Sequence, residues 1–261
     1  MYYIWSIENP ICRLVTTVSK THVQKIEWDR QNSNILYIGT RQNTLKVYDL
    51  NIKKIVQELV LNKQYPLVKF IFSTLAKKLV VVQLRDMDKS SQVILFEFSK
   101  NLNQLKSIVF ESFQILGIEE FSSDRLILAC SDGVVRLFDM HKQDLVLAQR
   151  CHNESIVNIQ INQEKNLLVT ATHDQIYIWN IEDQFELDFS SKIDNCSNGE
   201  NFMSLDSDQS VLFVLYESGC SLISLKRPNT LIQCEYQLDS STTFNLQNFS
   251  HMSILAVGNQ S

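Results

Sequence analysis

The chain has 261 residues, 44% of them hydrophobic and 20% charged, which supplies enough apolar surface for a buried core. Its formal net charge of −5 has the opposite sign to the basic surplus with which proteins neutralise nucleic-acid phosphates. No stretch reaches the roughly 18 to 20 apolar residues of a membrane span, and the N-terminal segment lacks the basic and long apolar parts of a secretory signal. We therefore expect an intracellular protein, cytoplasmic or nuclear, that binds no nucleic acid and has no membrane span.

A short pattern recurs along the chain: an apolar run, a polar turn, and a second run that usually ends in an aromatic and a polar residue. Apolar positions alternate within each run, which is the period of a β-strand, and the turns hold residues that tolerate turn backbone. In chain order, copies occupy residues 35–50, 79–98, 126–140, 167–181 and 211–225. Further strands are expected at residues 2–7 and 12–18, and at residues 243–248 and 253–258.

The spacing of these copies is regular. The polar residues that end the second runs are Ser6, Asp49, Glu97, Asp139, Asn180 and Ser224. They are separated by 43, 48, 42, 41 and 44 residues, and a four-stranded β-propeller blade repeats about every 40–45 residues. One strand follows each pair and another precedes the next pair, so each repeat is expected to contain four strands, a to d.

The motifs of these repeats resemble those of the WD40-repeat family, in which a Gly-His pair precedes a Trp-Asp pair, with a Ser/Thr-x-Asp turn between them. The best match is Cys151-His152, Thr172-His173-Asp174 and Trp179-Asn180. Partial matches are Ser131-Asp132 with Phe138-Asp139, and Gly39-Thr40 with Tyr48-Asp49. The resemblance covers essentially the whole chain, although it contains no strict Gly-His or Trp-Asp pair.

The resemblance implies an all-β, WD40-like β-propeller, with residues 1–261 as a single domain. Six four-stranded blades are expected, because the position that follows Ser224 by one period wraps round onto Ser6. The N-terminal strands would then complete the blade begun by residues 243–248 and 253–258, which would remove two exposed sheet edges. The alternative is that the chain is a fragment of a larger propeller or of a multidomain protein.

Four residues of the best-matched repeat correspond to the hydrogen-bonded tetrad of the family. The resemblance implies that the His152 imidazole bridges the Asp174 carboxylate, and that the Thr172 hydroxyl links to the Trp179 indole. A His–Asp pair also occurs in catalytic and metal sites, but the structural role is favoured because no nucleophile accompanies it. Cys151 beside His152 raises the alternative of a metal site, for which no third or fourth ligand has a recognisable spacing.

Two polar loops are candidates for partner binding, since long loops on a rigid scaffold commonly bind partners. The first, residues 85–92, is expected between strands b and c of one blade, and the second, residues 190–201, between successive blades on the same face. Their charged residues are Arg85, Asp86, Asp88 and Lys89 in the first and Lys192, Asp194 and Glu200 in the second, with Arg41 and His173 as neighbouring candidates. The alternatives are tolerated insertions and, for Asp86 and Asp88, a cation site.

The function expected from these observations is a non-catalytic scaffold that presents propeller faces to other proteins or peptides. Phosphate-cradling, zinc-protease and nucleophile-elbow motifs are absent from the sequence, so no cofactor, metal or small-molecule substrate is expected. Two alternatives remain: the chain is the propeller domain of a larger protein, or it is a propeller enzyme with acidic, histidine or metal groups in its channel.

Overall fold

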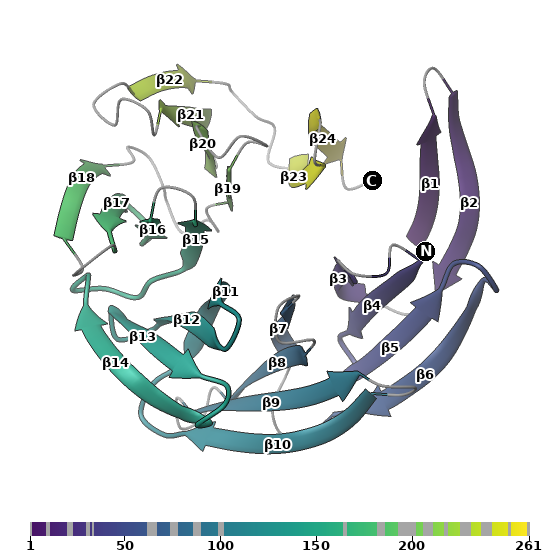
Figure 1. The fold of residues 1–261 in the computed structure, drawn as a ribbon. Coiled ribbons are helices and arrows are strands. Elements are labelled where there is room, and N and C mark those ends of the chain that lie inside the picture. The colour runs from purple at the N-terminus through teal and green to yellow at the C-terminus, as the bar shows by residue number, and fades with distance from the viewer. Residues whose placement is uncertain are drawn as a thin grey trace. The chain divides into compact units, whose positions relative to one another are not determined.

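The structure is a computed structural model in which the backbone is described for most of the chain. The described residues are 2–8, 11–19, 23–29, 32, 34–61, 67–73, 78–85, 90–98, 102–163, 166–181, 186–192, 202–205, 211–216, 219–224, 231–235, 242–249 and 252–259. All the secondary-structure elements of these residues are β-strands (Figure 1). The all-β prediction is therefore confirmed, and no helix of the described residues is long and apolar enough to cross a membrane.

The chain forms two compact units, residues 1–124 and 125–261. The strands of the first unit are β1 (Tyr2–Glu8), β2 (Ile11–Ser19), β3 (Val23–Trp28), β4 (Ile35–Thr40), β5 (Thr44–Asp49), β6 (Lys54–Val60), β7 (Leu67–Ser73), β8 (Lys78–Arg85), β9 (Ser90–Phe98), β10 (Leu102–Phe110) and β11 (Ile115–Ser122). Those of the second unit are β12 (Arg125–Cys130), β13 (Val134–Asp139), β14 (Asp144–Arg150), β15 (Asn158–Asn162), β16 (Leu167–Ala171), β17 (Gln175–Asn180), β18 (Glu186–Lys192), β19 (Phe202–Leu205), β20 (Val211–Tyr216), β21 (Gly219–Ser224), β22 (Leu231–Glu235), β23 (Thr242–Phe249) and β24 (Met252–Asn259).

Successive strands pair antiparallel, so the sheets are meanders. Complete four-stranded sheets are β3–β6 and β7–β10 in the first unit, and β15–β18 and β19–β22 in the second. Strands β12, β13 and β14 also pair in order, and the terminal strands form the two-stranded pairs β1–β2 and β23–β24. Four strands per repeat, in the order a to d, are what the sequence spacing predicted.

The register of the central strands is the same in each repeat. In each repeat, the first residue of strand b lies opposite the polar residue that ends strand c. These pairs are Ile35–Asp49, Lys78–Glu97, Arg125–Asp139, Leu167–Asn180 and Val211–Ser224. The polar residues that set the sequence period therefore occupy one structural position.

Two of these polar residues show why a short acidic side chain suits the end of strand c. Asp49 Oδ1 accepts a hydrogen bond from the Asn51 backbone N–H at 2.8 Å. Asp139 Oδ1 accepts bonds from the backbone N–H groups of His141 at 2.9 Å and Lys142 at 2.8 Å. Short carboxylate side chains stabilise turns in this way, so the aspartates begin the turn into strand d.

The core of each unit lies between neighbouring sheets. One cluster in the first unit combines strands β4, β5, β8 and β9, and its buried members are Ile35, Tyr37, Leu45, Val47, Leu61, Leu79, Val81, Ile94 and Phe96. The other face of β4 packs into a second cluster, with Leu36, Ile38 and Tyr48. Because both faces of the central strands are covered, their sequences read as nearly continuous apolar runs.

The equivalent cluster of the second unit joins the sheet β15–β18 to the sheet β19–β22. Its buried members are Leu167, Val169, Ala171, Ile176, Ile178, Leu212, Val214 and Ile223. The fourth strand of a sheet is different: most residues of β6 and β14 are exposed, including Val60 at 67% and Val146 at 40%. Buried central strands and an exposed fourth strand fit sheets that stack face to face and leave one edge outside.

A buried hydrogen bond ties β4 to the segment before it. The Tyr37 hydroxyl donates to Asp29 Oδ2 at 2.9 Å, and Asp29 Oδ1 accepts from the Asn32 backbone N–H at 3.1 Å. Burial and the adjacent Asp29 carboxylate both raise the pKa of Tyr37 above its ordinary value. The phenol therefore stays protonated and acts as a donor that satisfies the buried carboxylate.

Candidate functional site

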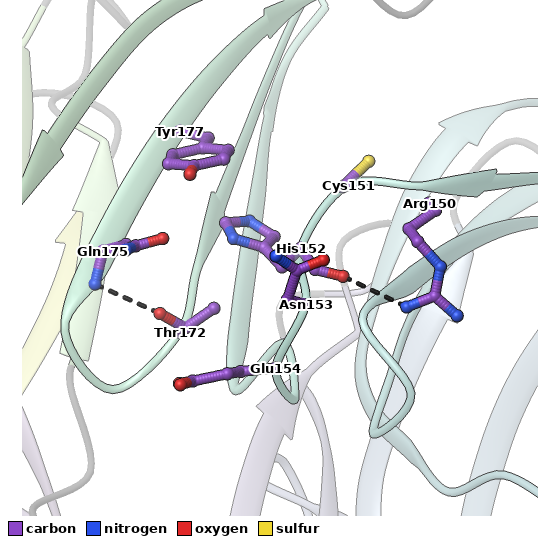
Figure 2. A pocket seen from close by; sticks show the side chains of 8 residues that line it. All are labelled: Arg150, Cys151, His152, Asn153, Glu154, Thr172, Gln175 and Tyr177. Atoms are coloured by element: carbon purple, nitrogen blue, oxygen red, sulfur yellow. Dashed lines mark hydrogen bonds between the residues drawn. The ribbon is translucent and has the colours of Figure 1, made fainter.

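A polar cavity of about 330 Å³ lies in the second unit, beside the connection from β14 to β15. Its lining residues are Arg150, Cys151, His152, Asn153, Glu154, Thr172, Gln175 and Tyr177 (Figure 2). Two segments supply them: residues 150–154, and the turn between β16 and β17 together with the start of β17. Both segments belong to the repeat that best matches the motif, so the cavity surrounds the residues of the predicted tetrad.

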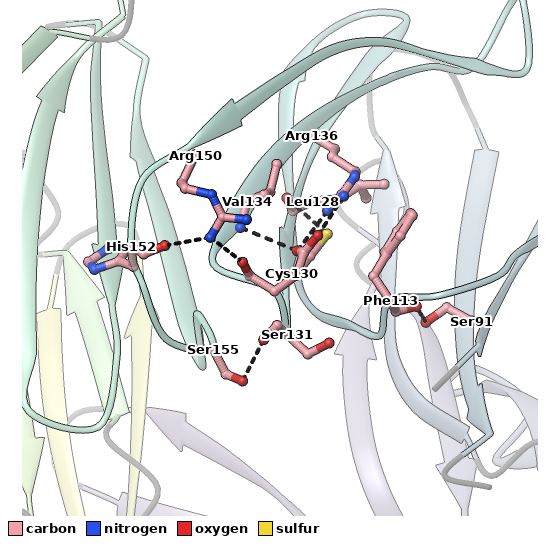
Figure 3. Close-up of polar contacts among 11 residues, drawn as sticks. Ser91, Phe113, Leu128, Cys130, Ser131, Val134, Arg136, Arg150, His152 and Ser155 are labelled. Carbon is pink, nitrogen blue, oxygen red and sulfur yellow. Dashed lines mark hydrogen bonds and ion pairs between the residues drawn. The ribbon is translucent and has the colours of Figure 1, made fainter. Parts of the chain in front are cut away.

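The connection, residues 151–157, is fixed by hydrogen bonds to the turn between β12 and β13. The backbone N–H groups of Cys151 and His152 both donate to the Gly133 carbonyl at 3.0 Å, and that of Ile156 donates to the Cys130 carbonyl at 3.1 Å. The Ser155 hydroxyl donates to the Ser131 carbonyl at 2.7 Å (Figure 3). The floor of the cavity is therefore held to two neighbouring sheets, since Val157 also donates to Ala171 of β16.

Gly133 allows the connection to approach this closely. Its φ is +76°, and a Cβ atom at this position would lie 2.1 Å from the His152 carbonyl oxygen and 2.8 Å from that of Glu154. Any side chain would therefore push the connection away from the turn. The corresponding turn of the first unit has Asn43 with φ 56°, a residue that tolerates this backbone conformation.

A buried hydrogen-bond network joins the connection to strands β16 and β17. His152 Nε2 lies 2.7 Å from Thr170 Oγ1, and Trp179 Nε1–H donates to the same oxygen at 2.9 Å. The sequence motif assigned this hydroxyl to Thr172, which is wrong: Thr170 lies inside β16, opposite Tyr177, on the same face of the sheet as Trp179. Alternate residues of a strand lie on the same face of the sheet, and this rule could have identified Thr170 as the partner of Trp179.

Thr172 and Asp174 instead form the turn between β16 and β17. The Thr172 hydroxyl donates to Asp174 Oδ1 at 3.1 Å and accepts from the Gln175 backbone N–H at 3.1 Å. The predicted hydrogen bond from His152 to Asp174 is not formed, because His152 Nδ1 has no hydrogen-bond partner among the described residues. The Asp174 carboxylate still acts on His152 electrostatically.

His152 is buried, with 4% of its surface exposed. Its ring stacks on Tyr177, with 4.3 Å between centroids, and meets the Trp179 ring edge to face at 6.4 Å. Burial lowers the pKa of His152 from 6.5 to about 4, although the Asp174 carboxylate acts to raise it. The imidazole is therefore neutral at physiological pH, and one of its two nitrogens must carry the proton.

Arg150 closes the side of the cavity next to β13 (Figure 3). Its Nη1 donates to the Asp132 carbonyl at 3.1 Å and to the His152 carbonyl at 3.4 Å. The Asp132 side chain holds a different arginine: Arg136 binds its two carboxylate oxygens at 2.8 and 2.6 Å. Burial acts to raise the pKa of Asp132, but the Arg136 bonds outweigh it, so this pKa lies below its ordinary value.

The chemistry available at the cavity is that of hydrogen bonding. Burial raises the pKa of the Cys130 and Cys151 thiols to about 12, so both stay protonated and lack the thiolate that a nucleophile or metal ligand requires. The described residues contain no group of three or more His, Cys, Asp or Glu side chains arranged to hold a metal ion. The Ser155 hydroxyl is turned to a backbone carbonyl.

The first loop predicted to bind partners is shorter than the sequence indicated. Strand β8 continues to Arg85 and β9 begins at Ser90, and Ser91 and Gln92 pair with Leu84 and Gln83. Only residues 86–89 separate the strands, so Asp86, Asp88 and Lys89 lie outside the described residues. The equivalent connections are residues 41–43, 131–133 and 172–174, so the bounds predicted for the loop, residues 85–92, are too wide, although the connection is still one residue longer than these counterparts.

The second predicted loop is also partly strand. Strand β18 extends to Lys192, so the connection to β19 runs over residues 193–201, and Asp194 and Glu200 lie outside the described residues. The two neighbouring candidates are both exposed in turns: Arg41 in the first unit, and His173 next to the cavity. That the two loops share one face of the molecule stays a prediction.

Sequence reasoning missed most of the cavity. Five lining residues were not candidates, because none of them belongs to the repeat motif: Arg150, Asn153, Glu154, Gln175 and Tyr177. Their sequence positions, beside His152 or near the start of the strand that carries Trp179, were the signal that could have placed them near the tetrad. Of the predicted tetrad, His152 and Thr172 line the cavity and Trp179 lies behind it in the shared network.

Comparison with known proteins gives one group of relatives. No protein-family model matches the chain. The chain is similar to WD repeat-containing protein 91 of Danio rerio, with 23% identity over 195 residues that cover 68% of this chain and 27% of that protein. The same protein of Mus musculus is 24% identical over 208 residues, again covering 68% and 27%. The WD repeat-containing protein 91 homolog of Dictyostelium discoideum is 22% identical over 174 residues, covering 65% and 22%.

These matches bear on the repeats and not on the relatives as whole proteins. They cover about two thirds of this chain, but the chain spans 27% or less of the length of each of the three relatives. The repeat period, the four-stranded meanders and the names of these relatives all indicate WD repeats.

Proposed function

Because this chain belongs to the WD40-repeat family of β-propeller proteins, we propose that it is a non-catalytic scaffold that binds partner proteins or peptides through the cavity beside His152. The observation that carries this proposal is the combination of a rigid frame and an exposed polar rim. Asn153 and Glu154 are exposed at the rim, whereas the connection beneath them is tied to strands of two sheets. Rigid elements that present adaptable polar groups are typical of binding surfaces.

The described groups at the cavity support binding in preference to catalysis. The Cys151 thiol stays protonated because of its raised pKa. The hydroxyl next to His152 Nε2 is that of Thr170, which is fully buried and also accepts from Trp179, so it is out of reach of a substrate. A hydrolytic site would need a nucleophile and a base within hydrogen-bond reach of each other, and the described lining residues supply no such pair. We propose a cytoplasmic or nuclear location for this activity.

A second candidate is that the chain acts as the interaction module of a larger protein. It is favoured by the share of the relatives that the chain spans, 27% in the Danio rerio protein. In that case the cavity would bind a partner in the same way. The other parts of the larger protein would determine which further molecules meet the bound partner. The size of the endogenous protein, measured by immunoblot, distinguishes the two candidates.

Affinity purification of the full chain, followed by mass spectrometry, tests the proposed function. The test variant is Glu154→Gln, which removes a charge from the rim without disturbing a buried group. The matched control is Glu111→Gln, because Glu111 is also exposed and also lies in a connection between successive sheets. We expect a protein that co-purifies with the wild type and with Glu111→Gln but is depleted with Glu154→Gln. Equal recovery with all three chains would contradict the use of this cavity.

A further inference from the structure

The Glu154 carboxylate is available to a ligand of the cavity. Its side chain lines the cavity, is exposed, and forms no hydrogen bond or ion pair among the described residues. The other acids of this region differ, because Arg136 pairs with Asp132 at 2.6 Å and the Asp174 carboxylate accepts from the Thr172 hydroxyl at 3.1 Å. Both oxygens of the Glu154 carboxylate can therefore accept hydrogen bonds from a bound molecule.

The charges around the cavity favour a cationic ligand. The exposed Asp174 carboxylate acts electrostatically on the His152 imidazole, so an anion near Glu154 would meet two like charges. Arg150 is the one cation among the lining residues, and it already donates to two backbone carbonyls. Figure 2 shows that the Glu154 side chain points away from Arg150, towards the side of the cavity that holds Gln175. A cation on that side would be attracted to the carboxylate.

Two further side chains offer oxygen atoms to a ligand with many donors. Gln175 and Tyr177 line the cavity and are half-buried, and their side chains form no hydrogen bond among the described residues. An arginine guanidinium carries a planar fork of N–H donors that fits a carboxylate bidentately and leaves other donors free, whereas a lysine ammonium is a compact point charge. A carboxylate beside an amide oxygen and a phenol oxygen therefore suits a guanidinium better than an ammonium.

We propose that this cavity binds the arginine side chain of a partner peptide, with its guanidinium on the Glu154 carboxylate and on the side-chain oxygens of Gln175 and Tyr177. The cavity volume of about 330 Å³ is at the lower end of ligand pockets, about 300–1,000 Å³, and suits one long side chain of a bound peptide. This inference rests on the proposed function, and specifies the chemistry that the scaffold recognises.

Peptide titration tests the inference. The probes are the blocked tripeptides acetyl-Ala-Xaa-Ala-amide with Xaa as Arg, Lys, Glu or citrulline, which keeps the shape of arginine without its charge. The backbone amide signals of residues 153–154 and 173–175 are followed in ¹H–¹⁵N spectra of the full chain. We expect the Arg peptide to shift these signals and to bind more tightly than the Lys peptide, and the citrulline and Glu peptides to leave them almost unchanged.

Glu154→Gln tests the carboxylate while it keeps the shape of the side chain. It should weaken the binding of the Arg peptide about tenfold, as expected for the loss of a hydrogen bond to a charged group. It should also reduce the dependence of this binding on salt. The Glu111→Gln control should bind like the wild type. Both variants should melt like the wild type, so a change in binding cannot be ascribed to unfolding.

Three outcomes of the titration would overturn the inference: binding of the citrulline or Glu peptide as tight as that of the Arg peptide, equal binding of the Arg and Lys peptides, or equal binding of the Arg peptide by both variants. None of them would affect the proposed function, which depends on recovery of a partner protein. Conversely, the absence of any co-purified partner, together with selective binding of the Arg peptide, would contradict the scaffold and leave the arginine site in place.

Discussion

His152 Nε2 and Thr170 Oγ1 lie 2.7 Å apart, so the connection between β14 and β15 is bonded to the interior of β16. The same oxygen accepts from the Trp179 indole, which makes Thr170 the central member of the network. Side chains from two other segments, His152 and Trp179, therefore depend on this single hydroxyl.

Thr170→Val should destabilise the protein by about 1–3 kcal/mol, because it leaves the buried Trp179 N–H and His152 nitrogen without their shared partner. Thr170→Ser retains the hydroxyl and should cost less. Asp174→Ala should also cost less than Thr170→Val, since Asp174 is exposed and bonds only to the turn in the described contacts. Denaturant unfolding measures the order, and a Thr170→Val chain as stable as the wild type would refute this network.

Acid should weaken the folded state through His152. The pKa of this group is about 4 in the folded protein and 6.5 ordinarily, so between these values the unfolded chain binds a proton that the folded chain does not. The stabilisation is complete above pH 6.5 and is lost as the pH falls towards 4. Melting temperatures measured across this range should fall less steeply in His152→Asn than in the wild type.

The control for this experiment is His141→Asn, because His141 is an exposed histidine of the same unit. Its pH profile should follow that of the wild type. If His152→Asn and His141→Asn give the same slope as the wild type, His152 is not held in its neutral form by folding.

Gly133 should tolerate no side chain. Gly133→Ala should cost at least about 1–2 kcal/mol from the left-handed backbone alone, and more because the new Cβ would meet the His152 carbonyl. Gly133→Asn separates the two causes. Asparagine accepts the left-handed backbone conformation, so any loss of stability in this variant comes from the contact of its Cβ atom with the His152 carbonyl. Equal stability of Gly133→Asn and the wild type would show that the connection can move away freely.

The terminal strand pairs make a prediction about closure. Strands β1–β2 and β23–β24 are two-stranded, while the complete sheets have four strands, and the sequence period places the terminal pairs in one repeat. If the ring closes as this period predicts, deleting residues 1–18 removes the strands that would complete the last blade, and should lower the melting temperature and cause aggregation. A truncated chain that melts like the full chain would favour an open fragment over a six-bladed ring.

The repeats were predictable from sequence because their signals are local. Alternating apolar runs, such as residues 35–40, and turn residues between them specify each b–c pair and its register. The acidic residue after each aromatic, such as Asp49 or Asp139, could be recognised because it bonds to the backbone only two or three residues away. A period of such local features predicts the meander before any long-range contact is known.

The site was less predictable because its contacts are not local. Thr170 reads as an ordinary β-strand residue, and its role depends on His152, which lies 18 positions away. Thr172, next to the turn, fits the motif but bonds within the turn. Glu154 and Arg150 carry no motif at all, and hydrogen bonds between residues far apart in the sequence, such as those of the connection to Gly133, bring them to the cavity rim.

Hydrogen–deuterium exchange of the full chain with and without its purified partner tests the central claim most directly, because it maps the bound surface without any substitution. If the cavity is the binding site, the partner should slow exchange in residues 153–157 and 173–175. The exposed strand β14 and the exposed residues Glu186, Leu187 and Ser190 of β18 should exchange as in the free chain. Protection confined to those outer strands, with residues 153–157 and 173–175 unchanged, would contradict the account and place the partner on the side of the sheets.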